Sequence, residues 1–306
     1  MIWNHQSTMK CLKTSGQDKL KLPYKLRSNQ QKIIDTIKKG LDSKNHVVIE
    51  APTGSGKTFT SLASALPLVL ENNRKIIYCV RTNSQQEQVI KELKEFKKSG
   101  NKVSVVAIQG RQSMCPQQKD DNELAKSNWS EKSKICKSLK LQSKMGEAGC
   151  PYYRKLVRPA KNLIANWSSE IYSAEEFTAN AEKEGLCPYE LNKLLLKEAQ
   201  VVIVPYVYFF EEFIRKYLLG WMETSIDKIV TIVDEAHNLP DWSRDAASDS
   251  LSVDSLRRAS QESNKFGLLL GDGSPPTLFL DLIESALRSL GEFHIAENDD
   301  EGLLPS

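Results

Sequence analysis

The chain lacks the features of membrane and secreted proteins. Its 306 residues contain no run of about 18 or more apolar residues, so we expect no membrane-spanning helix and no membrane partner. The polar N-terminal segment lacks the apolar centre of a secretory signal, which indicates a cytoplasmic protein. A strong charge is also missing, because a formal net charge of +3 is too small to indicate any partner.

Close cysteine pairs are missing as well. The chain has six cysteines, and no two of them have the C-x2-C spacing of common zinc ribbons. In a reducing compartment, cysteines are more often metal ligands or catalytic groups than disulfides. By spacing alone, Cys115, Cys136, Cys150 and Cys187 are either one metal site or four separate thiols.

The segment HVVIEAPTGSGKTFTSLASALPLVLEN predicts a strand, a loop and a helix in succession. Residues 46–50 form a β-branched run that suits a buried parallel strand. From Thr58 onward, apolar residues recur at helical spacing, and we expect Pro67 to kink or end that helix.

The loop between them has the pattern of a phosphate-binding loop, with alanine in place of the usual first glycine. Gly54, Ser55 and Gly56 would turn their backbone N–H groups onto a phosphate at the start of a helix. Lys57 would neutralise the β- and γ-phosphates of ATP, and Thr58 would offer its hydroxyl to Mg²⁺.

A second strand-end motif lies far downstream, in DKIVTIVDEAHNLPDW. Residues 229–233 predict another buried strand, and ligand sites of open α/β sheets lie at the carboxyl ends of the strands. Asp234 suits Mg²⁺ coordination, and Glu235 suits positioning or deprotonation of the attacking water. The two motifs together predict a binding site for ATP and Mg²⁺.

Residues 234–237, Asp-Glu-Ala-His, resemble the corresponding motif of superfamily 2 helicases. The resemblance implies that His237 couples the hydrolysis site to a second motor lobe; the alternative is a structural histidine at a strand end. Arg27 and Gln30 resemble an element that reads the adenine base in these helicases, although such a pair is also typical of a solvated helix face.

The segment YCVRTNSQQEQVIKEL looks like the second motif of iron–sulfur helicases related to the xeroderma pigmentosum group D helicase, XPD. A strand over residues 76–80 is followed by an amphipathic helix, and Cys79 inside the strand is expected in the core. The polar side chains after that strand suit contacts with a nucleic-acid backbone. These candidate DNA-binding residues are Arg81, Thr82, Asn83 and Gln85.

The XPD-like family inserts a small domain that holds a 4Fe–4S cluster where the four spaced cysteines occur here. The segments GRQSMC, GCPYY and GLCPYE also resemble segments of this family. The resemblance implies that the cluster ligands are Cys115, Cys136, Cys150 and Cys187. Arg111 matches a basic position that contacts the cluster region or DNA. A structural zinc module remains the alternative.

The same region is basic. Residues 132–161 contain nine lysines and arginines and a single acid, Glu147, with Tyr152 and Tyr153 among them. Cations interleaved with aromatic rings suit single-stranded DNA, although a solvated helix face has the same composition.

The resemblance implies an α/β fold, with the parallel sheet of a RecA-like P-loop NTPase (helicase motor lobe 1), an inserted 4Fe–4S domain and the start of a helical arch domain. Residues 1–110 would begin the lobe and residues 111–190 would form the iron–sulfur domain. Residues 191–245 would return to the lobe, and residues 246–306 would begin the arch, with helices near 250–263 and 280–290.

Motifs of a second motor lobe are absent from this sequence. We therefore expect the N-terminal part of an ATP-dependent 5′→3′ DNA helicase of the XPD type. By itself this chain should not unwind DNA. It would bind single-stranded or forked DNA, with repair proteins and a separate second-lobe chain as partners. The location would be nucleoid-associated in a prokaryote or nuclear in a eukaryote. A DinG-like or Fanconi-anaemia-J-like helicase, or a non-catalytic ATP- and DNA-binding subunit, remains open.

Overall fold

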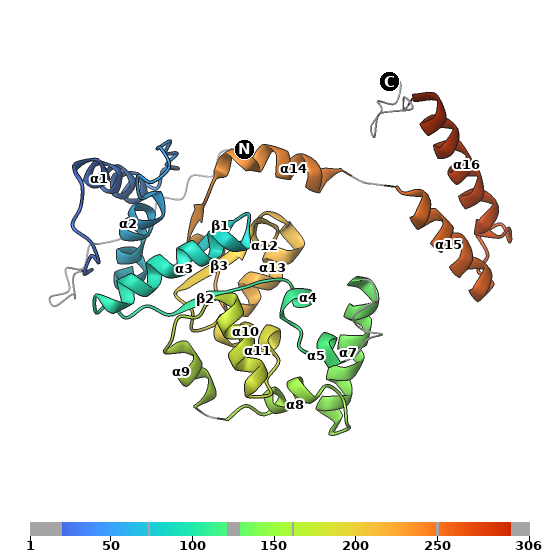
Figure 1. Cartoon of the computed structure of the whole chain (residues 1–306), viewed down its shortest axis with the longest axis horizontal. Helices are drawn as coiled ribbons and strands as arrows, with labels where there is room; N and C mark the ends of the chain where they lie inside the picture. The colour runs from blue at the N-terminus through green and yellow to red at the C-terminus, as the bar shows by residue number, and fades with distance from the viewer. Residues whose placement is uncertain (1–19, 73, 121–128, 161, 249–250, 295–306) are drawn as a thin grey trace. The chain divides into compact units, whose positions relative to one another are not determined.

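A computed structural model describes residues 20–72, 74–120, 129–160, 162–248 and 251–294 (Figure 1). These residues form two compact units, one ending at Ala236 and one starting at His237. Each unit is described separately below. Among the described residues, no helix is both long and apolar enough to cross a membrane.

A four-stranded parallel sheet forms the centre of the first unit. The strands are rich in valine and isoleucine, as expected for strands buried on both faces. They pair in the order β2-β3-β1-β4, so the expected α/β class with a parallel sheet is confirmed. Their bounds are β1 Lys75–Val80, β2 Val105–Ala107, β3 Val201–Pro205 and β4 Ile229–Val233.

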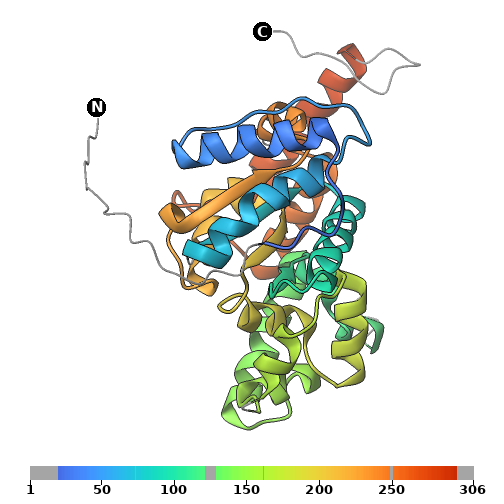
Figure 2. The ribbon, with the colours of Figure 1, turned by 90° about the vertical axis from the view of Figure 1, so that its left-hand side faces the viewer.

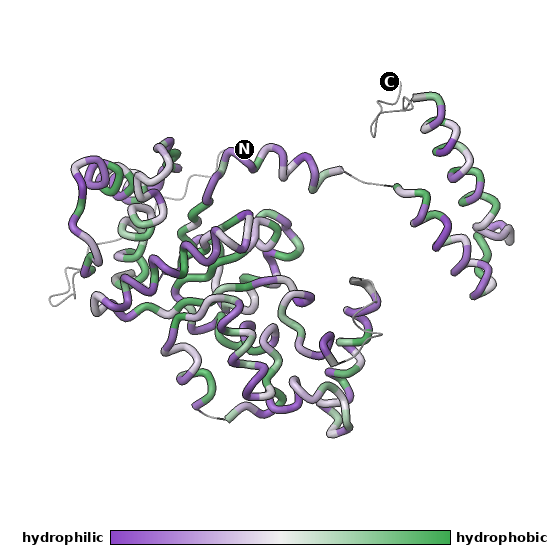
Figure 3. The backbone as a smooth tube through the Cα atoms, in the orientation of Figure 1, coloured by the Kyte–Doolittle hydropathy of each residue, from purple (hydrophilic) through white to green (hydrophobic). Residues whose placement is uncertain are grey.

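Helices cover the sheet, and the strand periodicity shows that both faces are buried. Ile76 and Tyr78 of β1 belong to the core cluster that includes the apolar sides of α2 and α3. Ile77 and Cys79, which point to the opposite face, are also fully buried. Figures 2 and 3 show the helices around the apolar strands. The helices outside the insertion are α1 Ser28–Asp42, α2 Lys57–Asn72, α3 Asn83–Lys98, α12 Tyr206–Phe210 and α13 Glu212–Trp221.

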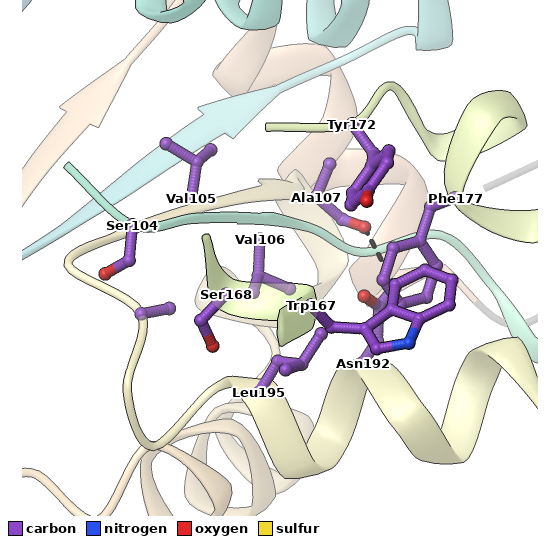
Figure 4. A pocket seen from close by; sticks show the side chains of 11 residues that line it. Ser104, Val105, Val106, Ala107, Trp167, Ser168, Tyr172, Phe177, Asn192 and Leu195 are labelled. Atoms are coloured by element: carbon purple, nitrogen blue, oxygen red, sulfur yellow. Dashed lines mark hydrogen bonds between the residues drawn. The ribbon is translucent and has the colours of Figure 1, made fainter. Parts of the chain in front are cut away.

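A helical insertion separates β2 from β3 in the chain. It packs against β2 through an aromatic cluster of Trp167, Tyr172 and Phe177, and Nδ2 of Asn192 donates to the carbonyl of Ala107 at 3.0 Å (Figure 4). The sheet thereby provides a fixed base for the insertion. Its helices are α4 Arg111–Met114, α5 Gln117–Asp120, α7 Trp129–Met145, α8 Pro151–Val157, α9 Leu163–Ser168, α10 Ala174–Lys183 and α11 Pro188–Leu195.

The second unit contains α14 Leu239–Ala247 and a helical hairpin of α15 Val253–Phe266 and α16 Pro276–His294. Gly267 ends α15 in the left-handed region at φ 59°, where glycine carries no steric penalty. The hairpin is tied by an ion pair of 2.9 Å between Arg257 and Glu284. Both expected helices are present, and the second is longer than predicted.

The structure corrects two expectations near the phosphate loop. Residues 46–50 form no strand in the described structure, and Val48 is 94 % exposed. A β-branched run has only a preference, and strand formation also requires a hydrogen-bonding neighbour, which these residues do not have here. Pro67 neither ends nor interrupts α2. Burial of Leu62, Leu66 and Val69 offsets the cost of about 3 kcal/mol for proline inside a helix.

Candidate functional site

The phosphate loop turns sharply ahead of α2. Gly54 and Gly56 have φ values of 79° and 85°, a region that favours glycine. A Cβ atom on Gly56 would lie 2.5 Å from Nε2 of Gln30, so that glycine also permits a close approach. The same Nε2 donates to the carbonyl of Ser55 at 3.2 Å. Gln30, predicted from the sequence as an adenine reader, therefore packs on the loop itself.

Lys57 connects the loop to the downstream carboxylates. Its Nζ donates to the carbonyl of Ala51 at 3.0 Å and lies 3.9 Å from Oε1 of Glu235. Thr58, the next residue, is buried to 8 % exposure at the start of α2. The structure thus brings the two predicted halves of the ATP site together.

Asp234 and Glu235 follow β4 directly. The backbone N–H of Asp234 donates to the carbonyl of Cys79 at 2.9 Å, which extends the pairing with β1. Glu235 has a φ of 47°, unusual for a residue with a side chain. Burial raises the pKa of Asp234, and the nearby Glu235 charge raises it further while Lys57 opposes the shift. Because its pKa is raised, the carboxylate of Asp234 would be stabilised by binding a cation.

Tyr206, at the start of α12, holds this turn and was not predicted from the sequence. Its hydroxyl donates to the carbonyl of Asp234, and it donates to that of Glu235 at 3.2 Å. Burial raises the pKa of Tyr206 to about 12, so the hydroxyl keeps its proton. The motif PYVYFF offered no signal for this role, because aromatic residues after a strand usually enter the core.

Two further residues were predicted for nucleotide handling. His237 belongs to the second unit, with its Nε2 3.2 Å from Nδ2 of Asn238. Arg27 is the exposed residue that precedes α1, and its backbone N–H donates to Oε1 of Gln30 at 3.1 Å. Their roles stay predictions.

The polar residues after β1 serve the start of α3. Oγ1 of Thr82 accepts from the backbone N–H of Gln85 at 3.3 Å, and Oε1 of Gln85 accepts from the N–H groups of Arg81 and Thr82. This reciprocal arrangement is a capping box. Arg81, Thr82 and Asn83 are exposed at the carboxyl end of the strand. Their predicted contacts with DNA stay predictions, and the capping role of Thr82 and Gln85 was missed.

The four spaced cysteines of the insertion line one pocket. Cys115, Cys136, Cys150 and Cys187 come from different helices or helix ends and face the same hollow. None of them forms a disulfide. In the described part of the chain, no three Cys, His, Asp or Glu side chains form a group that could hold a metal ion. Cys79 is in the sheet core as expected, and Cys11 lies outside the described residues.

The N-terminal ends of three helices face three of these sulfur atoms. Backbone N–H groups in the first turns of α5, α8 and α11 face Cys115, Cys150 and Cys187 and favour their thiolates. Burial outweighs them and raises the pKa of all four thiols, to about 12 for Cys187. Four thiols around one pocket, three of them facing backbone N–H groups, are the donor set of an iron–sulfur cluster, so the residues fit that group.

Charged side chains surround the pocket. Arg111 lines it, donates from Nη1 to Oγ of Ser133 at 3.3 Å, and lies over the Tyr189 ring at 5.0 Å. Glu190, only 8 % exposed, pairs with Lys140 at 2.7 Å and Lys193 at 3.1 Å. Lys140 belongs to the predicted basic segment, so part of that charge balances a buried acid. Glu190 was missed, although GLCPYE places it one turn after Cys187.

Comparison with known proteins identifies the family. A family model described as DEAD_2 matches residues 78–256, more than half of the chain. The chain belongs to the DEAD_2 family. It is 26 % identical over 263 residues to the regulator of telomere elongation helicase 1 homolog of Arabidopsis thaliana, an alignment that covers 75 % of this chain and 24 % of that protein.

A second relative of this DEAD_2 chain is the general transcription and DNA repair factor IIH helicase subunit XPD/RAD3 of Saccharomyces cerevisiae. It is 28 % identical over 259 residues, covering 79 % of this chain and 32 % of that protein. A solved XPD helicase structure matches the fold with a TM-score of 0.58 and 21 % identity, over 92 % of this chain and 44 % of the other. The predicted XPD-like resemblance is confirmed. The chain spans about a quarter to a third of the length of these curated relatives.

Proposed function

We propose that this DEAD_2 chain is the ATP- and single-stranded-DNA-binding part of an XPD-type DNA helicase that translocates 5′→3′ and serves DNA repair. The observation that carries the proposal is the 3.9 Å separation between Nζ of Lys57 and Oε1 of Glu235. A phosphate-neutralising cation and a water-positioning carboxylate at this separation suit phosphoryl transfer to water. The match to the DEAD_2 family and the likeness to the XPD/RAD3 helicase subunit support the same assignment.

Each residue of the site has a proposed task. The turn at Gly54, Ser55 and Gly56 and the ammonium of Lys57 hold the phosphates, while Thr58 and Asp234 hold Mg²⁺. Glu235 orients the attacking water, or takes its proton. Mg²⁺ neutralises charge on the phosphates when it is bound.

Outside this centre, Arg27 and Gln30 would read the adenine base, with Gln30 held against the loop by its bond to the carbonyl of Ser55. His237 links the centre to a second lobe supplied by the rest of a longer protein or by another chain. The domain limits proposed from the sequence, 1–110, 111–190, 191–245 and 246–306, go with this assignment.

The cysteine pocket is proposed to hold a 4Fe–4S cluster, with Cys115, Cys136, Cys150 and Cys187 as ligands. In such a cluster each iron takes one cysteine, so the four sulfurs surround a hollow instead of meeting at one ion. The pocket lined by four thiols supports this reading over a structural zinc ion. The group would supply rigid cross-links among short helices that bury little apolar surface themselves.

DNA is the proposed ligand of the surface beside these sites. Arg81, Asn83 and Arg111, with capping residues Thr82 and Gln85 keeping the turn in place, would meet a strand backbone. The proposed partners are single-stranded or forked DNA, repair proteins and a second-lobe chain. The protein would be located with the DNA, in the nucleoid of a prokaryote or the nucleus of a eukaryote. A DinG-like or Fanconi-anaemia-J-like helicase remains the nearest alternative.

The test is ATP turnover of the purified chain with and without single-stranded DNA. We expect slow turnover that the strand stimulates, because a lone lobe lacks the arginine that contributes about 10³ to 10⁵ in rate. Stimulation would exclude a non-catalytic binding subunit. Absence of both turnover and ATP·Mg²⁺ binding would overturn the proposal.

A further inference from the structure

Helix α13 has two apolar faces, which is unusual for a helix on the outside of a sheet. Leu218 and Met222 are fully buried on the side that packs inward. On another side, Phe213 is 65 % exposed and Tyr217 is 51 % exposed. Amphipathic helices normally place charged and polar residues there. Packing of the unit therefore does not account for these exposed rings.

The exposed rings form a row with Trp221. The three residues are spaced four apart, so they follow one another along the helix surface. The ring centroids of Phe213 and Tyr217 are 5.0 Å apart, and those of Tyr217 and Trp221 are 6.2 Å apart. We call Phe213, Tyr217 and Trp221 the aromatic row.

Cations connect the aromatic row to the edge of the cysteine pocket. Nζ of Lys193 lies 4.7 Å from the Trp221 centroid and 5.9 Å from that of Tyr189. The guanidinium of Arg111 also lies 5.0 Å from the centroid of the Tyr189 ring. Rings and cations thus alternate without a break from Arg111 to the aromatic row, across α4, α11 and α13.

We propose that the aromatic row stacks the bases of a single-stranded nucleic acid, extending the DNA path beyond Arg111. This inference rests on the proposed function, because Arg111 is the DNA contact from which the path continues. Every base has a π-face, so such a platform binds without reading sequence. Lys193, which shares Glu190 with Lys140, would meet the phosphates beside the row.

The alternating cations favour a nucleic acid over a protein partner. The centre of a protein-binding patch is depleted of lysine, whereas here Lys193 lies near both the Trp221 and the Tyr189 rings. The acids nearby are paired within the chain: Glu190 with Lys140 and Lys193, Glu212 with Lys216, and Glu223 with Lys197. Because two lysines share Glu190, these lysines and Arg111 together keep a net positive charge beside the aromatic row.

The experiment measures binding of the full chain to labelled oligothymidylate of about 20 nucleotides, longer than a usual single-strand site. The test variant carries Phe213→Ala and Tyr217→Ala together. The matched control is Phe266→Ala in the second unit, because Phe266 is 67 % exposed and Lys265 lies 5.6 Å from its ring centroid. An abasic strand of the same length separates stacking from phosphate contact. Circular dichroism confirms that each variant is folded.

We expect the double variant to bind oligothymidylate at least about tenfold more weakly, since stacking contributes about 1–3 kcal/mol per base. On the abasic strand the two proteins should bind alike, and Phe266→Ala should match the unchanged chain. Equal binding of oligothymidylate by the double variant and the unchanged chain would overturn this inference alone. No binding by the unchanged chain would overturn the proposed DNA function as well.

Discussion

The ammonium nitrogen of Lys57 lies 3.9 Å from Oε1 of Glu235, although Lys57 precedes β1 in the chain and Glu235 follows β4. This distance is longer than a hydrogen bond, and both side chains are 34 % exposed. Exposed pairs of this kind contribute at most about 1 kcal/mol. A phosphate can therefore take the lysine at little cost, while the carboxylate stays beside it.

Removing the half-buried charge of Asp234 should stabilise the protein and abolish its function. The folded-state pKa of Asp234 is raised, so protonation favours the folded state, and the stability it gives is lost as pH rises from 3.8 through the raised value. We expect Asp234→Asn to raise the unfolding temperature at pH 7 by about 2 °C.

Below pH 3.8 the difference should vanish, because the carboxyl is then neutral in both states. Thermal unfolding between pH 3 and 8 tests this, with ATP·Mg²⁺ binding measured in parallel. A variant that is less stable than the unchanged chain at neutral pH would contradict the role of desolvation.

Tyr206→Phe should disturb the turn that carries the two carboxylates. The hydroxyl donates to the carbonyls of both Asp234 and Glu235, and its loss should reduce the free energy of unfolding by about 1 kcal/mol. We expect turnover to fall about tenfold, with less than a twofold change in nucleotide affinity, because the carboxylates are misplaced but present. Steady-state kinetics and denaturant unfolding provide the two readouts. Tyr208→Phe, at a buried tyrosine whose hydroxyl bonds Gln109, is the control.

Single cysteine substitutions should distinguish ligands from core residues. Cys115→Ser and Cys150→Ser should lose iron and acid-labile sulfide and loosen the insertion, because both line the shared pocket. Cys79→Ala, at a buried cysteine in β1 outside the pocket, should keep its metal. Anaerobic purification followed by iron, sulfide and zinc analysis gives the answer. Full metal content in either serine variant removes that cysteine from the ligand set, and zinc without sulfide indicates the structural zinc alternative.

Glu190→Gln should destabilise the insertion. Burial alone would raise the pKa of Glu190, but hydrogen bonds and charges from Lys140 and Lys193 outweigh it and lower the pKa. The stability from this acid is therefore present above its ordinary pKa and is lost as pH falls through the lowered value. We expect a loss of about 2 kcal/mol at neutral pH, because two lysines lose their partner.

A double variant, Glu190→Gln with Lys140→Met, should recover part of that loss, since the unpaired ammonium is removed as well. Urea unfolding at pH 7 measures all three proteins. If Glu190→Gln is as stable as the unchanged chain, the network has no structural role.

Much of the fold was predictable from local sequence. Residues 229–233 are a continuous β-branched run, and residues 76–80 are a short apolar run rich in β-branched side chains. Both patterns are typical of buried strands. The helix after Thr82 carries its own capping signal in Thr82 and Gln85. The motifs at Lys57 and Asp234 were found because phosphate chemistry constrains the residue types and their spacing.

Other features depend on which distant residues meet, and the sequence does not encode that locally. Residues 46–50 have strand composition but no pairing partner. The convergence of Cys115 and Cys187 on one pocket depends on how α4 and α11 pack. The hydroxyl of Tyr206 reaches the carboxylate turn because β3 and β4 flank β1 as parallel strands and end at the same edge of the sheet.

The most direct test of the account is calorimetric binding of a non-hydrolysable ATP analogue with Mg²⁺. We expect one site per chain that requires Mg²⁺, and Lys57→Ala should weaken it about 10- to 100-fold while the fold stays intact, because a charge-assisted bond contributes about 1.5–3 kcal/mol. Lys44→Ala, at an exposed lysine beyond α1, is the control. Unchanged affinity in Lys57→Ala, or no binding by the unchanged chain, would contradict the assignment of the ATP site.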